Sequence, residues 1–413
     1  MLAMTSTRDL TARAAVAVVG VGAMGAGIAQ VAALAGHEVH LVDAREGAAA
    51  QAVEALGERL RRLADKGRIT AVDAGQAIGR LHVAGTGVSG ANPTGIRSGG
   101  TDIADLPPVG LVIEAVVEDL DVKREIFAAL AQRQPLDTVL ATNTSSLDIS
   151  AIAAGLPKPD RVIGLHFFNP PPLMRLVEVI RGVDSSRAVL DNAAALIRAW
   201  GKTPVECASS PGFIVNRVAR PFYGEAQRMV ADGTLDAATV DHALREHAGF
   251  RMGPMELTDL IGQDVNLAVG TSVWEQTRRD PRYEPTAYQQ QLVAEGRLGR
   301  KSGHGVFRYD ERGRPLDAEP DLALVERLVG GEVTTDPVAR TLAMIVNEAV
   351  DLVHRGVARA EDVDTAMRLG TNYPVGPFDW LDDLGADRIR HTLEALDRSF
   401  PGGRYRPSPG LKS

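Results

Sequence analysis

Cysteine and aromatic residues are scarce in this chain of 413 residues, with one cysteine, Cys207, and Phe, Trp and Tyr together at 4%. One cysteine excludes an internal disulfide and any metal site built from several cysteines, and we expect no metal. No apolar run reaches the roughly 18 uncharged residues that a membrane span needs. Residues 1–14 lack the charged-then-apolar order of a signal peptide. We therefore expect a cytoplasmic protein that does not bind membranes.

A strong positive charge is also missing. The formal net charge is −8, so the field of the protein will not attract nucleic acid, and no nucleic-acid partner is expected. One local exception is the run from Gly57 to Arg68, in which five basic residues face only Glu58 and Asp65. Most such runs are solvated helix faces. The alternative is a local contact with an anionic ligand.

A glycine-rich motif follows the first strand that we expect. The β-branched run Val16–Val19 leads directly into Gly20-Val21-Gly22-Ala23-Met24-Gly25, and residues 26–35 have helical character. A second strand is expected at 38–42, and Asp43 closes it. This order of strand, G-x-G-x-x-G, helix, strand and acid is typical of a dinucleotide-binding unit, whereas the glycines alone would be weak evidence.

Each part of this motif has a physical role. Gly20 permits the tight turn, Gly22 lets the backbone approach a pyrophosphate, and Gly25 lets helix and strand pack closely. The helix N-terminus offers N–H groups to the phosphates. Asp43 can accept hydrogen bonds from a ribose and would repel a 2′-phosphate, although Arg45 weakens this preference slightly. We expect NAD as the cofactor, bound by Gly20, Gly22, Ala23, Met24, Gly25 and Asp43.

Strands and helices continue to alternate in the first half. Further strands are expected at 81–84, 111–117, 139–141, 162–166 and 176–180, with a helix at 120–131 and a surface loop at 85–100. This alternation predicts an α/β, doubly wound Rossmann-type sheet. Ligands of such sheets bind beyond the carboxyl ends of the strands. Polar residues lie at those ends, namely Glu118, Asn143, Ser145 and His166.

His166 and Glu178 are candidates for an acid–base pair. They lie in successive strands joined by a turn at Pro170-Pro171-Pro172, which can bring imidazole and carboxylate side by side. Oxidation of an alcohol needs a base for the hydroxyl proton, and a carboxylate beside a histidine fixes its tautomer. The alternative is a structural histidine. It is disfavoured because Glu178 stands in an apolar strand, where a carboxylate is costly unless paired.

These motifs together resemble the 3-hydroxyacyl-CoA dehydrogenase family. HFFNP is followed by LVEVI, with TNTSS upstream and SSPGFIVNR downstream, and the resemblance extends from about Val16 to Tyr309. It implies NAD-dependent oxidation of a (3S)-3-hydroxyacyl-CoA to the 3-oxoacyl-CoA, or the reverse, in fatty-acid or aromatic catabolism. The acyl-CoA is thus the expected partner.

The resemblance also implies the catalytic residues. His166 would be the general base, Glu178 its partner, and Ser145 a hydrogen-bond partner of the substrate oxygen. Asn216 would add a donor to the same region. Other readings exist for two of them. Ser145 can instead cap a helix that starts near Leu147, and Asn216 can bond only to backbone.

Further binding residues follow from the same resemblance. Cofactor contacts are implied for Glu118, Lys123, Asn143, Asn169 and Lys301, although the two lysines can also be merely solvated. Lys66 matches a position that contacts the CoA phosphates, and Arg59 is a positional match only. The basic run 57–68 thereby gains a candidate partner.

The second half contains an internal repeat with a spacing of 123 residues. MGPMELTDLIGQD matches VGPFDWLDDLGAD, and Glu225 matches Glu348. We expect an all-α region of two helical modules, of which the second lacks the catalytic amide because Ala339 stands opposite Asn216. The expected domains are 1–207 (NAD-binding), 208–310 (first module), 311–335 (linker) and 336–413 (second, degenerate module).

Shorter relatives carry one such module and pair it with that of a second subunit. Here the second copy can take that place within the chain, so the protein is expected to be a monomer or a homodimer. The duplicated arrangement is similar to that of bacterial 3-hydroxybutyryl-CoA or 3-hydroxyadipyl-CoA dehydrogenases. Arg175, Arg217 and Arg220 are candidates for meeting a distal carboxylate, although such arginines are more often surface charges or structural ion pairs.

Two other functions stay open. A β-hydroxyacid dehydrogenase acting on a free acid has a similar architecture but depends on a catalytic lysine rather than a His–Glu pair. A non-catalytic, crystallin-like relative would retain the fold and lose the chemistry, and the presence of all four candidate catalytic residues argues against it.

Overall fold

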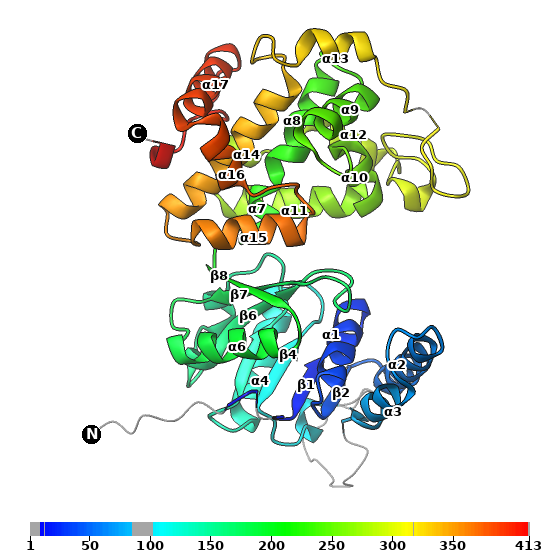
Figure 1. The fold of residues 1–413 in the computed structure, drawn as a ribbon. Helices are drawn as coiled ribbons and strands as arrows, with labels where there is room; N and C mark the ends of the chain where they lie inside the picture. The colour runs from blue at the N-terminus through cyan, green and yellow to red at the C-terminus, as the bar shows by residue number, and fades with distance from the viewer. Residues whose placement is uncertain (1–8, 12, 85–101, 317, 412–413) are drawn as a thin grey trace. The chain divides into compact units, whose positions relative to one another are not determined.

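The computed structural model describes residues 9–11, 13–84, 102–316 and 318–411. The chain divides into two compact units, Met1–Ser209 and Ser210–Ser413 (Figure 1). The first unit is α/β and the second is entirely helical, as the sequence predicts. Within the described residues, no helix has the length and apolar character that crossing a bilayer would require.

The first unit is built around one sheet. Its described strands are β1 (Val16–Val19), β2 (Val39–Val42), β3 (Leu81–Val83), β4 (Leu111–Glu114), β5 (Val139–Thr142), β6 (Val162–Phe167), β7 (Leu176–Arg181) and β8 (Thr203–Ala208). They lie in the order β3-β2-β1-β4-β5-β6-β7-β8. Strands β1 to β6 pair in parallel, β7 is antiparallel to β6, and β8 is parallel to β7. The strand order reverses between β1 and β4, which is where such sheets bind ligands.

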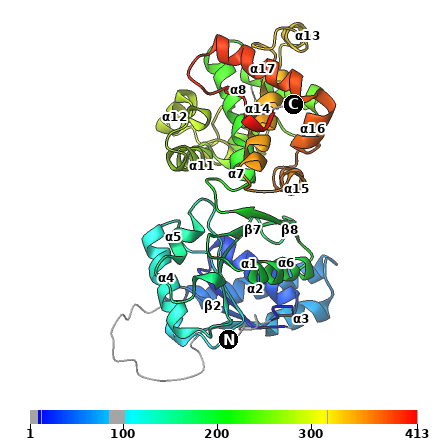
Figure 2. The same cartoon turned by 90° about the vertical axis from the view of Figure 1, so that its left-hand side faces the viewer.

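Helices cover both faces of this sheet. They are α1 (Ala23–Leu34), α2 (Ala48–Asp65), α3 (Ala71–Gly79), α4 (Leu120–Arg133), α5 (Ile149–Ala153) and α6 (Arg187–Ala199). Figure 2 shows α4 and α5 on one side of the sheet, and α1 and α6 on the other. Helices on both faces explain why the parallel strands are mostly apolar.

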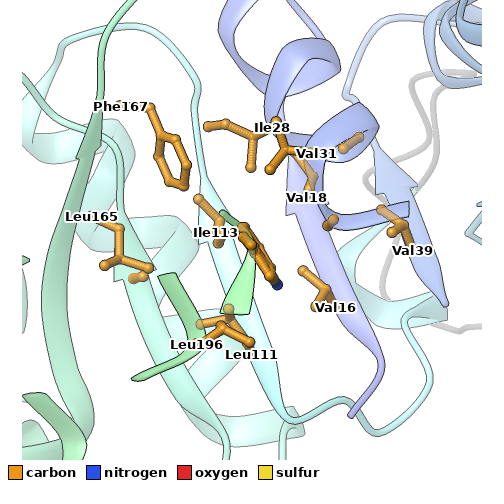
Figure 3. Packing of buried hydrophobic residues seen from close by; sticks show 14 of the residues in the cluster. Val16, Val18, Ile28, Val31, Val39, Leu111, Ile113, Leu165, Phe167 and Leu196 are labelled. Atoms are coloured by element: carbon orange, nitrogen blue, oxygen red, sulfur yellow. The ribbon is translucent and has the colours of Figure 1, made fainter. Parts of the chain in front are cut away.

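The main apolar core lies on the α1 and α6 face. Alternate strand residues point to this face, including Val18 of β1 and Ile113 of β4, and they pack with Ile28 of α1 and Leu196 of α6 (Figure 3). The intervening residues point to the opposite face. The strand register places Glu114, Thr142 and His166 on that second face.

In this unit the structure differs from the sequence-based expectation in two places. The strand expected at 111–117 ends at Glu114, because the Glu114 carboxylate accepts a hydrogen bond from the N–H of Val116 and the backbone leaves the ladder. Strand β8 was not expected. The loop expected at 85–100 lies outside the described residues.

The second unit contains the two expected helical copies. The first holds α7 (Val215–Val218), α8 (Arg220–Ala231), α9 (Ala237–Ala248), α10 (Pro254–Ile261), α11 (Gln263–Gln276) and α12 (Ala287–Ala294). The second holds α14 (Pro337–His354), α15 (Ala360–Gly370), α16 (Pro377–Leu384) and α17 (Ala386–Ser399). At the spacing of 123 residues, α16 and α17 reproduce the bounds of α10 and α11. The segment 311–335, expected as a linker, contains the helix α13 (Leu322–Leu328).

Equivalent residues make equivalent contacts in the two copies. Asp241 accepts a hydrogen bond from the N–H of Met255 at 2.8 Å, and Asp364 accepts one from the N–H of Phe378 at 2.9 Å. A Cβ added at Gly253 or Gly376 would lie 2.2 or 2.1 Å from the carboxyl carbon of the matching aspartate. The glycine of each Gly-Pro pair is therefore required, because an aspartate side chain packs directly against the start of the helix.

The two copies are interlocked through buried ion pairs. Glu225 of the first copy accepts hydrogen bonds from three residues of the second copy, at 2.7 to 2.9 Å. These residues are Arg340, Arg404 and Tyr405. Glu348 of the second copy is bound in the same way, by residues of the first, namely Arg217, Arg282 and Tyr283. Both glutamates are fully buried. Each copy thus supplies the carboxylate that neutralises arginines of the other.

Candidate active site

His166 and Glu178 face each other across two antiparallel strands. In the register of β6 and β7 the two residues are direct partners. Their Nδ1 and Oε2 atoms lie 2.6 Å apart, a distance typical of a charge-assisted hydrogen bond. The Glu178 side chain is fully buried and that of His166 is 8% exposed. This pairing explains how an apolar strand accommodates an acid.

The hydrogen bond decides which nitrogen of His166 can accept a proton. Because a carboxylate only accepts hydrogen bonds, Nδ1 carries the proton, and Nε2 is the basic nitrogen of the neutral ring. The Phe168 ring packs against the imidazole, with the ring centroids 4.5 Å apart. A proton taken up at Nε2 would give an imidazolium that the Glu178 charge stabilises. The pair is therefore suited to general acid–base chemistry.

Glu118 organises the segment that contains Ser145. Its Oε1 atom accepts hydrogen bonds from the Thr144 hydroxyl at 2.6 Å and from the Ser145 N–H at 2.8 Å. The Ser146 N–H donates to the same atom at 3.0 Å, and the Ser145 hydroxyl at 3.2 Å. Burial alone would raise the pKa of Glu118, but the Thr144 hydrogen bond and the charge of Lys123 lower it below its ordinary value. Glu118 is thus an ionised anchor that orients Ser145.

Ser145 does not cap a helix. The helix after this segment, α5, begins at Ile149, and its N-cap is Asp148, which accepts from the Ser150 N–H. The alternative that Ser145 caps a helix starting near Leu147 is therefore wrong. Its hydroxyl donates to Glu118 at 3.2 Å, a longer hydrogen bond than the 2.6 Å bond of the Thr144 hydroxyl.

Lys123 and Glu114 form a buried network behind this segment. Lys123 is 1% exposed, so the alternative that it is solvated is wrong. Its Nζ donates to Glu114 at 2.7 Å and lies 3.5 Å from Glu118. Glu114 also accepts from the Thr142 hydroxyl at 2.7 Å. Sequence reasoning missed Glu114, although an acid at the end of the buried strand LVIE requires a partner such as Lys123.

Of the two candidate cofactor asparagines, Asn143 is tied to the strand that carries His166. Its Oδ1 accepts from the Phe167 N–H at 2.8 Å, and its own N–H donates to the Glu114 carbonyl at 2.7 Å. Asn143 therefore fixes the end of β6 next to His166. Asn169 is exposed and precedes Pro170 through a cis peptide bond.

The glycine turn has the geometry that the motif predicts. Gly20 has φ +92, and a Cβ there would lie 2.6 Å from the Ala115 carbonyl oxygen. A Cβ at Gly25 would lie 1.8 Å from the Gly20 carbonyl oxygen, so both positions require glycine. A Cβ at Gly22, in contrast, would meet nothing within 4 Å. No atom of the described residues accounts for that glycine, and the open space in front of it fits a pyrophosphate.

The start of α1 supports the same conclusion. Its N-cap is Gly22, which has no side chain to satisfy the first N–H groups. Among the residues that the structure describes, none accepts a hydrogen bond from the N–H of Ala23, Met24 or Gly25. Free N–H groups at the positive end of a 12-residue helix form a site for phosphate. Further along α1, a Cβ at Gly27 would lie 2.8 Å from the Pro171 ring, so this helix packs closely against the turn after His166.

Asp43 joins the glycine turn to the end of β2. Its Oδ2 accepts from the Val21 N–H at 3.0 Å, and its Oδ1 accepts from Arg45 Nε at 2.9 Å. Burial works to raise the pKa of Asp43, yet the hydrogen bonds from Arg45 and Val21 lower it. The carboxylate is thus ionised and correctly placed to accept from a ribose. Arg45 is exposed and neutralises part of its charge.

Two of the candidate residues belong to the second unit. Asn216 lies in α7, and its carbonyl accepts a hydrogen bond from Arg220 Nε at 2.9 Å. Lys301 lies in the 3-10 segment Arg300–Ser302, and its Nζ pairs with Asp264 at 2.6 Å. Because Asp264 balances the charge of Lys301, a further contact of this lysine with a cofactor would have to compete with that ion pair.

The basic run lies on α2 and just after it. Arg59 lies within the helix, and Lys66 is its exposed C-cap residue. Within the described part of the chain, the only ion pair of this run joins Arg62 to Glu58. Lys66 and Arg59 therefore keep uncompensated charge that an anionic ligand can use.

Two family models match the chain. The model described as "3-hydroxyacyl-CoA dehydrogenase, NAD binding domain" matches residues 15–210. The model described as "3-hydroxyacyl-CoA dehydrogenase, C-terminal domain" matches two segments, 212–309 and 337–413. The split match agrees with the two helical copies of the second unit.

Curated relatives and a solved structure agree with these models. The chain is 40% identical to a 3-hydroxyadipyl-CoA dehydrogenase of Escherichia coli, with 96% of each chain covered. It is 38% identical to a 3-hydroxybutyryl-CoA dehydrogenase of Clostridioides difficile, over 71% of this chain and 99% of the relative. A crystal structure described as 3-hydroxybutyryl-CoA dehydrogenase from Escherichia coli matches with a TM-score of 0.84 and 39% identity, covering 96% of this chain and 97% of that one.

Proposed function

Because the chain belongs to the 3-hydroxyacyl-CoA dehydrogenase family and is an NAD-dependent oxidoreductase of that family, we propose that His166 and Glu178 carry its reaction. The substrate is a (3S)-3-hydroxyacyl-CoA, and the product is the 3-oxoacyl-CoA. The observation that carries the proposal is the buried hydrogen bond of 2.6 Å between His166 Nδ1 and Glu178 Oε2.

The chain's residues handle the proton of the 3-hydroxyl group. His166 Nε2 accepts this proton as the C–H bond at C3 breaks, and Glu178 stabilises the resulting imidazolium. NAD, when bound, takes the hydride from C3. In the reverse direction the imidazolium of His166 returns its proton to the 3-oxo oxygen. Ser145, oriented by Glu118, and Asn216 are the proposed hydrogen-bond partners of the substrate oxygens.

The proposed cofactor contacts form two groups, one for the pyrophosphate and ribose and one for the nicotinamide. Gly20, Gly22, Gly25 and the N–H groups of Ala23 and Met24 would hold the pyrophosphate, and Asp43 the ribose. Glu118, Asn143 and Asn169 lie at or near the strand ends that would face the nicotinamide. Lys123 supports this region from within, through Glu114 and Glu118. Lys301 remains a proposed cofactor-side residue of the second unit.

Turnover of a thioester is the direct test of this function. We expect NADH oxidation with acetoacetyl-CoA and none with free acetoacetate. Turnover of the free acid alone would instead support a β-hydroxyacid dehydrogenase. If neither is reduced while NADH still binds, and longer or carboxylated acyl-CoAs are inert too, the chain is a non-catalytic relative.

Lys66 is proposed to contact the CoA phosphates. Replacing Lys66 by glutamate should raise the KM for acyl-CoA by roughly 3- to 10-fold, the range expected for an exposed ion pair and its reversal, and leave the KM for NAD unchanged. The matched control is Arg133→Glu, which makes the same change of charge sign at the exposed C-terminal end of α4. An acyl-CoA KM that stays the same in Lys66→Glu would show that the basic run is only a solvated helix face.

The acyl group is proposed to be 3-hydroxybutyryl or 3-hydroxyadipyl. Both names occur among relatives that cover nearly the whole chain. The two groups differ in one chemical feature, because only the adipyl group ends in a carboxylate. The choice between them therefore depends on whether the chain has a cation for that carboxylate.

A further inference from the structure

Arg220 is a partly buried cation without a carboxylate partner. Its Nε donates to the Asn216 carbonyl at 2.9 Å, and its Nη1 donates to the Asn266 carbonyl at 3.2 Å. Among the described residues, no aspartate or glutamate forms an ion pair with it. Burial lowers the pKa of Arg220, since no nearby carboxylate compensates for the lost hydration. A buried guanidinium without a counter-charge destabilises the fold, so binding of an anionic ligand would compensate for its lost hydration.

The other arginines named from the sequence are in different situations. Arg217, three residues earlier, is buried and fully committed to Glu348 and Asp351. It is therefore a structural ion pair and cannot bind a substrate carboxylate. Arg175 is exposed and lies in the first unit, just before β7. Arg220 alone of the three combines partial burial with an uncompensated charge.

The guanidinium of Arg220 is also held in a fixed orientation. It lies over the Tyr223 ring, 5.0 Å from the ring centroid, and its Nε and Nη1 contacts fix its plane. Nη2 has no acceptor among the described residues. The outer edge of the guanidinium, formed by Nη1 and Nη2, can therefore accept a carboxylate in the bidentate geometry that arginine favours. Because the group is already ordered, little entropy is lost when it binds an anion.

The position of Arg220 suits one acyl length. It lies four residues after Asn216 on a continuous helical stretch, and its side chain turns back so that Nε is 2.9 Å from the Asn216 carbonyl oxygen. In a 3-hydroxyadipyl group, three carbon–carbon bonds of about 1.5 Å separate C3 from the carboxyl carbon, or about 4 Å when extended. If Asn216 binds an oxygen near C3, the distal carboxylate can reach Arg220. A butyryl group ends one bond beyond C3 and cannot.

We infer that Arg220 binds the distal carboxylate of the acyl group and so selects 3-hydroxyadipyl-CoA or a close ω-carboxylated analogue. This inference rests on the proposed function of the chain. Arg220 is thereby a specificity-determining residue, and its effect depends on the terminal group of the substrate. Arg220 also fixes the backbone at Asn216 through its hydrogen bond to the Asn216 carbonyl. The experiment must separate this structural effect from substrate binding.

The test compares two six-carbon substrates that differ only at the terminus. 3-Hydroxyadipyl-CoA ends in a carboxylate and 3-hydroxyhexanoyl-CoA in a methyl group, and kcat/KM with NAD is measured for both with the full chain. The wild type should prefer the adipyl substrate. Arg220→Gln should lower kcat/KM for the adipyl substrate by roughly 10- to 100-fold, as for a lost charge-assisted hydrogen bond, and change the hexanoyl value less than about 3-fold. Arg175→Gln, which removes an exposed charge, should keep the wild-type preference.

Several results would overturn the inference. An equal loss for both substrates in Arg220→Gln would show that the arginine acts only through Asn216. Loss of the preference for the adipyl substrate in Arg175→Gln would show that Arg175, and not Arg220, binds the distal carboxylate. Equal kcat/KM values of the wild type for the two substrates would refute the inference. This result does not depend on whether Arg220→Gln folds. Turnover of acetoacetyl-CoA but of neither six-carbon substrate would also overturn the inference, whereas absence of turnover with all three acyl-CoAs would refute the proposed function itself.

Discussion

Replacing His166 by alanine is expected to lower kcat by about 10²- to 10⁴-fold, the usual contribution of a general base. The substitution removes the imidazole that is proposed to accept the hydroxyl proton and takes the His166 hydrogen bond away from the buried Glu178 carboxylate. NADH affinity should change little, because the glycine turn and Asp43 are proposed to bind the other half of the cofactor. The measurements are kcat with acetoacetyl-CoA and the NADH dissociation constant from fluorescence titration.

Glu178→Gln separates the role of the carboxylate from that of the ring. Glutamine keeps the shape but can donate as well as accept, so it no longer fixes the proton on Nδ1 of His166 or stabilises the imidazolium. We expect a loss of kcat in the same range, again with NADH binding retained. His391→Ala is the matched control for His166→Ala, since His391 is exposed and its Nδ1 bonds to the Asp387 carbonyl. A parallel loss of NADH affinity in His166→Ala would mean that the histidine is structural.

The His166–Glu178 pair was accessible from the sequence because local features define it. Two short strands joined by a proline turn leave few registers, and the side chains of an antiparallel pair meet at a fixed spacing. The glycine turn was accessible for the same reason, since Gly20 and Gly25 are required by backbone atoms of the adjacent strand or of the same βα unit. Residues whose partners are near in sequence or in register can thus be placed without a structure.

The roles of the arginines and of Glu114 could not be predicted in this way. Arg217 and Arg220 look alike in the sequence, and they differ because the partners of Arg217 lie about 130 residues further along the chain. Glu118 was expected at the cofactor, and the structure adds that it anchors Ser145 through a turn 27 residues away. Such long-range side-chain contacts leave no periodic signal. Strand β8 and helix α13 were missed because short elements with mixed polarity resemble loops.

The buried glutamates of the helical unit lead to the second large prediction. Glu225→Gln should lower the free energy of unfolding of this unit by about 3–5 kcal/mol at pH 7, because it leaves Arg340 and Arg404 buried without their counter-charge. Glu348→Gln should act in the same direction, since Glu348 neutralises Arg217 and Arg282 in the equivalent position. The interlocked copies are thus expected to lose stability together, whichever carboxylate is removed.

The effect should depend on pH in a defined direction. Burial would raise the pKa of Glu225, but the charges of Arg404 and Arg340 lower it to about 2, below the value of about 4.3 for an unfolded chain. A lowered folded pKa means that the stabilisation is fully present above about pH 5 and is lost as pH falls toward 2. Glutamine resembles the protonated side chain, so the difference between wild type and Glu225→Gln should shrink across this window.

Tryptophan fluorescence can isolate the helical unit for this measurement. The three tryptophans are Trp200 in the first unit and Trp274 and Trp380 in the second, so a Trp200→Phe background reports urea unfolding of the second unit alone. Glu394→Gln is the matched control, because it removes the same charge from a half-exposed position of α17 and should cost less than about 0.5 kcal/mol. If Glu225→Gln were as stable as this control at pH 7, the buried ion pairs would not hold the two copies together, and their stability would have to come from apolar packing between α8 and α14.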